Sequence, residues 1–233
     1  MIGKLYGLGL GPGDPELLTL KAHRILTQCP VVAYPAPDTG PSFARQIAAP
    51  YLTAAQLEVP IVVPMRVERF PAQDIYTQAA ETLSHHLDAG SDVAVLCEGD
   101  PFFYGSFMHL WRRLSHRFPT EVVPGVTGMA GAWTRANAPI TWGDDILTVL
   151  PGTLPEAELV RRLGDTDAAV IMKLGRNLPK VRRALEATGL IERAIYVEQA
   201  TMAGQAIIRL SERDDAEAPY FSMVLVPGEG RRL

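Results

Sequence analysis

Residues 4–22 read KLYGLGLGPGDPELLTLKA, and this stretch shows how the fold begins. The apolar run from Lys4 to Leu10 is typical of a buried strand, which the following glycines end. Asp14-Pro15-Glu16 then has the composition of a helix start: a side-chain acceptor, a proline at the first helical position and an acid in the first turn. The segment therefore predicts a strand, a tight glycine turn and a helix.

The same alternation of apolar runs and helical patterns continues outward from this segment. Because strands alternate with helices, we expect an α/β fold with a mostly parallel sheet. The expected strands are residues 31–34, 61–63 and 92–97, and the expected helices are residues 71–89 and 106–115.

The pattern changes near residue 122, where we expect a boundary between a first domain, 1–121, and a second, 122–233. The last two apolar runs, 205–210 and 221–226, have no helix between them, so they are expected to be antiparallel and the second sheet to be mixed. The other elements expected in this half are strands 146–150, 168–172 and 194–197 and helices 156–163 and 179–187.

The composition narrows the class of protein. The chain has 233 residues with 22 Lys plus Arg against 26 Asp plus Glu, a net charge of −4, so general binding to a nucleic-acid backbone is disfavoured. Two cysteines and five histidines show no disulfide framework or metal-ligand spacing. No signal peptide or long apolar span is visible. These features predict a cytoplasmic protein without a bound metal or a membrane partner.

The first glycine turn does not carry the dinucleotide fingerprint GxGxxG. Starting from Gly9, the third glycine position is Asp14, and starting from Gly7 it is Pro12, which also lacks an N–H for a pyrophosphate. No GxxxxGK[ST] phosphate loop occurs either. From spacing alone, the turn is either a ligand-binding loop or a structural strand-to-helix connection.

A second unusual loop is CEGDPFFYGS, residues 97–106, directly after a predicted buried strand. Ligands bind outside the carboxyl ends of strands in open α/β sheets. Two carboxylates on either side of Gly99 and three consecutive aromatic residues suit a flat heterocycle or a sulfonium cation. The alternative is that the aromatic residues extend the core and Asp100 caps the turn.

Together, these segments resemble the tetrapyrrole methylase family, which uses S-adenosylmethionine. The matching segments are GLGPGDPELLTLKA (9–22), EGDPFFYGSF (98–107), PGVTGM (124–129) and VIMK (170–173) with Asn177. Residues 34–37 (YPAP) and 99–110 are most similar to the branch that methylates precorrin-2. The uroporphyrinogen-methylating branch has an aspartate where this chain has Pro35, so that catalytic acid is not transferred to this sequence.

The resemblance implies two αβα domains with S-adenosylmethionine in a cleft between them, no metal, and a homodimer. It also implies the residues that would bind the cofactor, largely through main-chain groups. By motif they are Pro12, Glu98, Gly99, Asp100, Phe103, Thr127, Gly128, Met172 and Ala200.

The implied reaction is methyl transfer to a meso carbon of precorrin-2, a small-molecule substrate, or of its cobalt-bearing counterpart. No residue stands out as the base that removes the proton afterwards. Four basic residues follow predicted strands and are candidates for binding substrate carboxylates, namely Arg66, Arg69, Lys173 and Arg176. The alternatives of another class are a nicotinamide-dependent oxidoreductase and a non-catalytic nucleotide-binding module.

Overall fold

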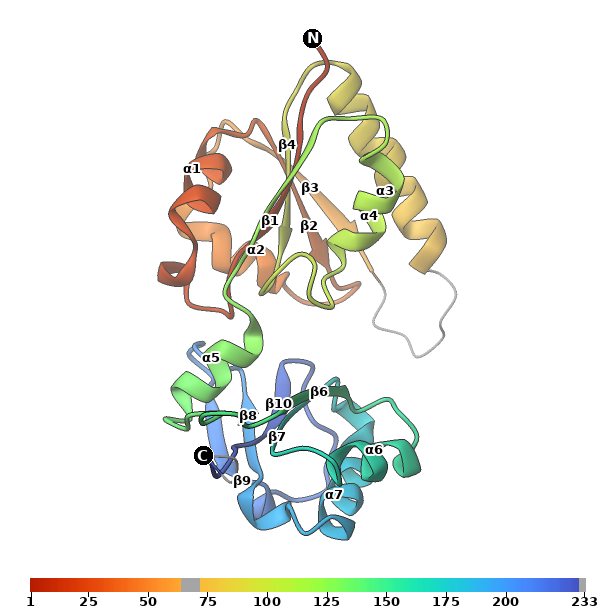
Figure 1. Ribbon diagram of the computed structural model, residues 1–233. Coiled ribbons are helices and arrows are strands. Elements are labelled where there is room, and N and C mark those ends of the chain that lie inside the picture. Colours follow the sequence, from red (N-terminus) through yellow and green to blue (C-terminus); the bar gives the residue numbers. More distant parts are fainter. Residues whose placement is uncertain (64–71, 231–233) are drawn as a thin grey trace. The chain divides into compact units, whose positions relative to one another are not determined.

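The computed structural model describes residues 1–63 and 72–230 of the chain (Figure 1). The chain forms two compact units, Met1–Gly128 and Met129–Leu233, and each is described here by itself.

The first unit contains a parallel sheet, as predicted. Every strand pair in it is parallel, and the strand order is β3-β2-β4-β1-β5. The central strand β4 is fully buried, in keeping with its unbroken apolar sequence VAVLC. The strands are β1 (Leu5–Gly9), β2 (Val31–Ala36), β3 (Leu57–Val62), β4 (Val93–Cys97) and β5 (Thr120–Val123).

Helices cover both faces of this sheet (Figure 1). On one face α1 (Leu20–Gln28) and α2 (Phe43–Ala48) bury Leu26 and Ile47, among other residues, against the strands. On the other face α3 (Ala72–Asp88) and α4 (Phe107–Leu114) enclose a second apolar cluster with the sheet. The unit is therefore an αβα sandwich.

The first predicted helix does not begin at Asp14. The Asp14 side chain accepts the Glu16 N–H at 2.9 Å and caps a single 3₁₀ turn, η1 (Pro15–Leu17). The α-helix begins at Leu20, where the Thr19 hydroxyl accepts the Ala22 N–H. The chain thus contains two N-capped helical segments in succession, η1 and α1. The residues with helical apolar periodicity belong to the second segment, α1.

The second unit has a mixed sheet with strand order β6-β7-β10-β8-β9. Strands β6 and β7 are parallel, whereas β10 is antiparallel to both β7 and β8. Strand β8 lies between the last two strands and is antiparallel to both, so β9 and β10 run in the same direction; the expectation that they are antiparallel to each other is wrong, while the mixed sheet is as predicted. The strands are β6 (Leu147–Pro151), β7 (Ala168–Met172), β8 (Ile195–Glu198), β9 (Ala206–Arg209) and β10 (Ser222–Val226).

This sheet also has helices on both faces (Figure 1). Helices α6 (Glu156–Leu163) and α7 (Leu178–Ala187) pack on one face, and α5 (Gly128–Arg135) contributes Ala132 to the cluster on the other. The remaining 3₁₀ turns are η2 (Ala49–Tyr51), η3 (Gly175–Asn177), η4 (Ile191–Arg193) and η5 (Leu210–Glu212). The expected pair of αβα domains is confirmed.

The boundary predicted between residues 121 and 122 lies inside β5. That strand continues to Val123 and pairs with β1 in the first sheet, so Val122 and Val123 belong to the first unit. The division between the units follows Gly128. The sequence pattern changes near residue 122 because β5 ends at Val123 and the segment 124–128 follows it. The division between the two units comes only after that segment.

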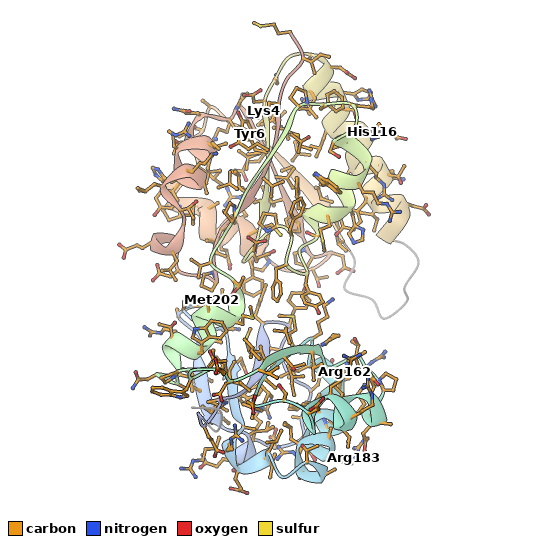
Figure 2. The ribbon with its side chains drawn as sticks, viewed as in Figure 1. Lys4, Tyr6, His116, Arg162, Arg183 and Met202 are labelled. Carbon is orange, nitrogen blue, oxygen red and sulfur yellow. The ribbon has the colours of Figure 1, made fainter. Side chains whose placement is uncertain are left out.

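Polar side chains lie on the surfaces of both units (Figure 2). The Lys4 ammonium lies 4.9 Å from the centre of the Tyr6 ring and donates to Glu121 of β5 at 2.5 Å. In the second unit, Arg162 and Arg183 are paired with Glu158 and Glu156. Among the described residues, no helix is long and apolar enough to cross a lipid bilayer.

Candidate functional site

Three loops follow three adjacent strands at one edge of the first sheet. Residues 10–14 follow β1, residues 98–106 follow β4, and residues 124–127 follow β5. Because the three strands are parallel, their carboxyl ends lie at the same edge, which is where α/β sheets bind ligands. The segments that the sequence singled out independently are therefore brought together.

The first two loops are held to each other through their backbones. The Gly99 N–H donates to the Gly11 carbonyl at 2.8 Å, and the Gly11 N–H donates to the Gly99 carbonyl at 3.3 Å. Gly99 has a φ of +66°, in the left-handed region that side chains other than glycine rarely adopt. This geometry accounts for glycine at position 99.

Asp100 connects the loop after β4 to the loop after β5. One carboxylate oxygen, Oδ1, accepts the Phe102 N–H at 2.9 Å. The other oxygen, Oδ2, accepts the Gly125 N–H at 3.1 Å. Asp100 thus caps its own turn, as one of the two interpretations of this loop predicted. Its bond to Gly125 also links the loop after β4 to the loop after β5.

The Glu98 carboxylate, like that of Asp100, accepts backbone hydrogen bonds within the first unit. This partly buried carboxylate accepts a backbone hydrogen bond from Ala44, in the first turn of α2. Burial raises the pKa of the Glu98 carboxyl above its ordinary value, while the backbone hydrogen bonds act in the opposite direction. Helix α2 was absent from the sequence prediction, so this partner could not be anticipated.

Aromatic residues occupy the middle of the second loop. Phe103 is half-buried, and its ring packs edge-to-face against the Tyr104 ring at a centroid distance of 5.1 Å. Tyr104 is 45% exposed and has a φ of +56°, a strained conformation for an aromatic residue. Tyr104 was not among the predicted site residues, although the aromatic run contained it. An exposed, strained ring beside glycine backbone is suited to stacking on a flat ligand.

The remaining candidates of the first unit lie near these loops. Pro12 is half-buried in the loop after β1. A side chain added at Gly99 would have its Cβ 3.5 Å from the Gly128 nitrogen and 3.9 Å from the Thr127 Cα. Thr127 and Gly128 therefore lie next to the Gly99 turn, as the motifs predicted for residues of one site.

The second unit provides its own loop cluster at the carboxyl ends of β7 and β8. These strands run in the same direction because β10 is antiparallel to both. Met172 ends β7, and its carbonyl accepts the Gly152 N–H at 2.6 Å. Ala200 follows β8, between two residues with positive φ, Gln199 and Thr201. The two predicted cofactor residues of this unit thus share one sheet edge.

A glutamine missed by the sequence analysis anchors the loop that contains Ala200. The Gln205 side-chain oxygen accepts the Thr201 N–H at 3.0 Å and the Arg135 Nε–H at 2.9 Å. Arg135 is in α5, so this amide connects the loop to that helix. Gln205 carries no recognisable motif, and only the fold reveals its position.

The basic candidates divide into two pairs. Lys173 directly follows β7 with a φ of +57°, and Arg176 lies in the 3₁₀ turn η3 next to it. Both therefore belong to the same sheet edge as Met172. Arg66 and Arg69 lie outside the described residues.

The sequence matches the family of Tetrapyrrole (Corrin/Porphyrin) Methylases over residues 4–214. The match covers most of the chain, and the glycine loops of that resemblance occur together at the sheet edges described above. The chain belongs to this family and is a methyltransferase.

Individual relatives narrow the comparison. The chain is 52% identical to Precorrin-2 C(20)-methyltransferase from Sinorhizobium sp, over 97% of this chain and 96% of that protein. It is 34% identical to Cobalt-precorrin-2 C(20)-methyltransferase from Salmonella typhimurium, over 97% of both. Among solved structures, cobalt precorrin-4 methyltransferase matches with a TM-score of 0.73 and 26% identity, over 96% of this chain and 94% of that one.

Proposed function

We propose that this chain methylates precorrin-2 at C(20), with S-adenosylmethionine as methyl donor, to give precorrin-3A during cobalamin biosynthesis. The observation that carries the proposal is the 52% identity to Precorrin-2 C(20)-methyltransferase over nearly the full length of both proteins. Because the match covers 97% of this chain, the compared region includes the loops of both units.

The chemistry of the glycine loops fits a cofactor such as S-adenosylmethionine. The edge of the first sheet offers backbone and aromatic surface, and its two acids, Glu98 and Asp100, already accept backbone N–H groups. Such a surface suits a purine bound by main-chain groups and ring packing. Pro12, Gly99, Phe103, Thr127 and Gly128 remain the proposed contacts of the first unit, and Met172 and Ala200 those of the second.

When bound, S-adenosylmethionine would supply an electrophilic methyl group on a cationic sulfur. The meso carbon of a reduced tetrapyrrole is electron-rich, so it can serve as the nucleophile without an intermediate on the protein. The work of the chain is then to orient the substrate and to exclude water. The base that takes the departing proton is not assigned to any residue.

The substrate carboxylates would be bound by the basic candidates Arg66, Arg69, Lys173 and Arg176. Arginine binds a carboxylate through two parallel hydrogen bonds, and lysine acts as a point charge. The position of Lys173 and Arg176 beside Met172 supports the second pair. The family resemblance further supports a homodimer in the cytoplasm, and light scattering on the purified protein would test the dimer.

The decisive experiment is mass spectrometry of the tetrapyrrole after incubation with isotopically labelled S-adenosylmethionine. We expect one labelled methyl group at C(20) of precorrin-2. A parallel incubation with cobalt-bearing precorrin-2 distinguishes the two substrates, since the Salmonella relative carries the cobalt form in its name. If the methyl group is transferred only to cobalt-bearing precorrin-2, then that compound, and not metal-free precorrin-2, is the substrate.

Calorimetry tests the methyl donor separately from the tetrapyrrole. S-adenosylmethionine and S-adenosylhomocysteine are expected to bind, whereas NAD is not, because the dinucleotide fingerprint fails at Pro12 and Asp14. Binding of NAD without binding of S-adenosylhomocysteine would contradict the proposal and favour an oxidoreductase.

A further inference from the structure

Asp100 has the most consequential side-chain contact at the edge of the first sheet. Its bond to Phe102 is local, because it joins residues two positions apart. Its bond to Gly125 joins residues 25 positions apart, in loops that follow β4 and β5. Because β1 lies between those strands in the sheet, this bond joins two loops whose strands are not neighbours.

The backbones at this point are packed too closely for any side chain. A Cβ added to Gly125 would lie 2.8 Å from the Gly9 Cα, and a Cβ added to Gly9 would lie 2.8 Å from the Gly99 carbonyl oxygen. Contacts of that length essentially never occur for real Cβ atoms, so neither Gly9 nor Gly125 can carry a side chain unless the backbone shifts. Backbone hydrogen bonds between Gly11 and Gly99 hold the loops after β1 and β4 together, and the Asp100 carboxylate adds a bond that ties the loop after β5 to them.

Asp100 is the residue placed to do this. Its two oxygens accept from both loops at once, and a carboxylate makes stronger hydrogen bonds to N–H groups than a neutral acceptor does. Its own carbonyl also accepts the Phe103 N–H at 3.2 Å, so the aromatic part of the loop is tied to the same residue. An asparagine could keep only one of the two side-chain bonds, since its amide NH₂ cannot accept from an N–H.

We propose that Asp100 is a positioning residue: it fixes residues 124–128 against the Gly99 turn and thereby sets the geometry of the cofactor site. The inference rests on the proposed function only in naming S-adenosylmethionine as the ligand of this edge. It revises the role expected from the motif, in which Asp100 would contact the cofactor directly.

The chain offers a matched control at the opposite edge of the same sheet. There the Asp92 carboxylate accepts the Lys4 N–H at 2.7 Å, which also joins two neighbouring strands through one backbone hydrogen bond. Asp92→Ala therefore removes a similar bond far from the carboxyl ends of the strands, whereas Asp92→Asn keeps an oxygen that can accept the Lys4 N–H. Asp92→Ala thus reports the general cost of losing such a bond.

The experiment compares Asp100→Ala and Asp100→Asn with the two Asp92 variants. The readouts are thermal unfolding, the dissociation constant of S-adenosylhomocysteine, and the hydrogen-exchange rate of residues 124–128 in the absence of ligand. We expect Asp100→Ala to weaken S-adenosylhomocysteine binding by tenfold or more, with Asp100→Asn intermediate, and to accelerate exchange in residues 124–128. Asp92→Ala is expected to lower the melting temperature about as much as Asp100→Ala and Asp92→Asn less, and both Asp92 variants should change the affinity by less than twofold.

Steady-state kinetics add a readout that a purely structural role would not change. The KM for S-adenosylmethionine is expected to rise in Asp100→Asn, while the KM for the tetrapyrrole changes little. If Asp100→Ala fails to fold, Asp100→Asn still gives the answer, because it keeps one of the two bonds. Unchanged affinity in Asp100→Ala, or in Asp100→Asn when the Gly125 amide exchanges faster, would overturn this inference alone, whereas failure of the unaltered chain to bind S-adenosylhomocysteine would contradict the proposed function.

Discussion

A substitution at Gly99 has two separate effects: it strains the backbone, which has a positive φ, and it adds atoms next to the loop after β5. The Gly99 φ of +66° penalises any side chain, while an added Cβ would make only ordinary van der Waals contacts, the nearest being the Gly128 nitrogen at 3.5 Å. Gly189 in the second unit has a φ of +71° and nothing within 4 Å of such a Cβ. The two glycines thus share the backbone strain and differ in their location.

We expect Gly99→Ala and Gly189→Ala each to lower the free energy of unfolding by about 1 kcal/mol, the cost of a left-handed L residue. Only Gly99→Ala is expected to weaken S-adenosylhomocysteine binding, and the larger Gly99→Val more so, because both place carbon where the ligand must meet backbone. Chemical denaturation and calorimetry measure the two effects. Equal affinities in Gly99→Ala and Gly189→Ala would remove Gly99 from the site.

The two cysteines are predicted to take no part in catalysis. Cys29 and Cys97 are buried, and desolvation raises the pKa of each thiol to about 12. A thiolate is the nucleophile, so neither residue is one at neutral pH. Cys29→Ser and Cys97→Ala should retain turnover within about tenfold, or roughly 1.4 kcal/mol of barrier.

A thiol reagent gives an independent check on the same point. At about pH 8, close to the ordinary pKa of a free thiol, the folded protein should react slowly with iodoacetamide and keep its activity. Both thiols should react once the protein is denatured. Rapid inactivation of the folded protein, with protection by substrate, would show a reactive cysteine at the site.

At the scale of elements, Glu121 connects three parts of the first unit. Its carboxylate, in β5, pairs with Lys4 before β1 and with Lys21 of α1, and these hydrogen bonds lower its pKa to about 2. Because the pKa in the folded state lies below the ordinary value of 4.5, the contribution to stability is present above about pH 4.5. It is lost as the pH falls from there toward 2.

We therefore expect Glu121→Gln to destabilise the chain by about 1 kcal/mol at neutral pH, since the carboxylate is partly exposed and screened by solvent. The difference from the unaltered chain should shrink below about pH 4.5 and disappear near pH 2. Glu158→Gln is the comparison, because that carboxylate pairs with Arg161 and Arg162 on its own helix. Urea denaturation at several pH values measures both, and a larger effect for Glu158→Gln would contradict the expectation.

The elements that the sequence predicts well are those with uninterrupted patterns. Strand β7, Ala168–Met172, and helix α6, Glu156–Leu163, have the predicted bounds because an apolar run and an amphipathic period define them. Helix α2 was missed because its six residues are too few to show a period and follow a Pro- and Gly-rich loop. The start of α1 was misplaced because Asp14 and Thr19 are both good caps.

The site was predictable to the level of loops and no further. Glycine turns after apolar strands indicate where a sheet edge can bind a ligand, and this pattern identified the loops after β1 and β4, whereas the loop after β5 was proposed only through the family resemblance. The Gly125 N–H donates to Asp100 and the Arg135 Nε–H donates to Gln205, across 25 and 70 positions of sequence. Such contacts depend on how distant elements are arranged in the fold, so no local pattern could have revealed them.

At the scale of the whole molecule, charge sets a requirement on substrate binding. The net charge of −4 repels a substrate with eight carboxylates, the number in precorrin-2, so binding must depend on local basic residues. We expect Arg66→Ala, Arg69→Ala, Lys173→Ala and Arg176→Ala each to raise the KM for precorrin-2 by about tenfold or more. This corresponds to about 1.5–3 kcal/mol for a lost charged hydrogen bond.

The effect should be larger at low than at moderate salt, and the affinity for S-adenosylmethionine should stay the same. Arg162→Ala is the matched control, because Arg162 is paired with Glu158 on the helical face of the second unit. Steady-state kinetics at two salt concentrations give the answer. Normal KM values in all four variants would mean that other groups bind the carboxylates.

The strand order of the second sheet has a consequence for the timing of synthesis. Strand β10 is the last to be made, yet it lies in the middle of the sheet and joins the pair β6-β7 to the pair β8-β9. Until residues 222–226 have been synthesised, no β10 can pair with β7 and β8, so the sheet of the second unit cannot be completed. The five strands of the first sheet have all been synthesised by then. A premature stop before Ser222 should therefore yield a folded first unit attached to a protease-sensitive remainder.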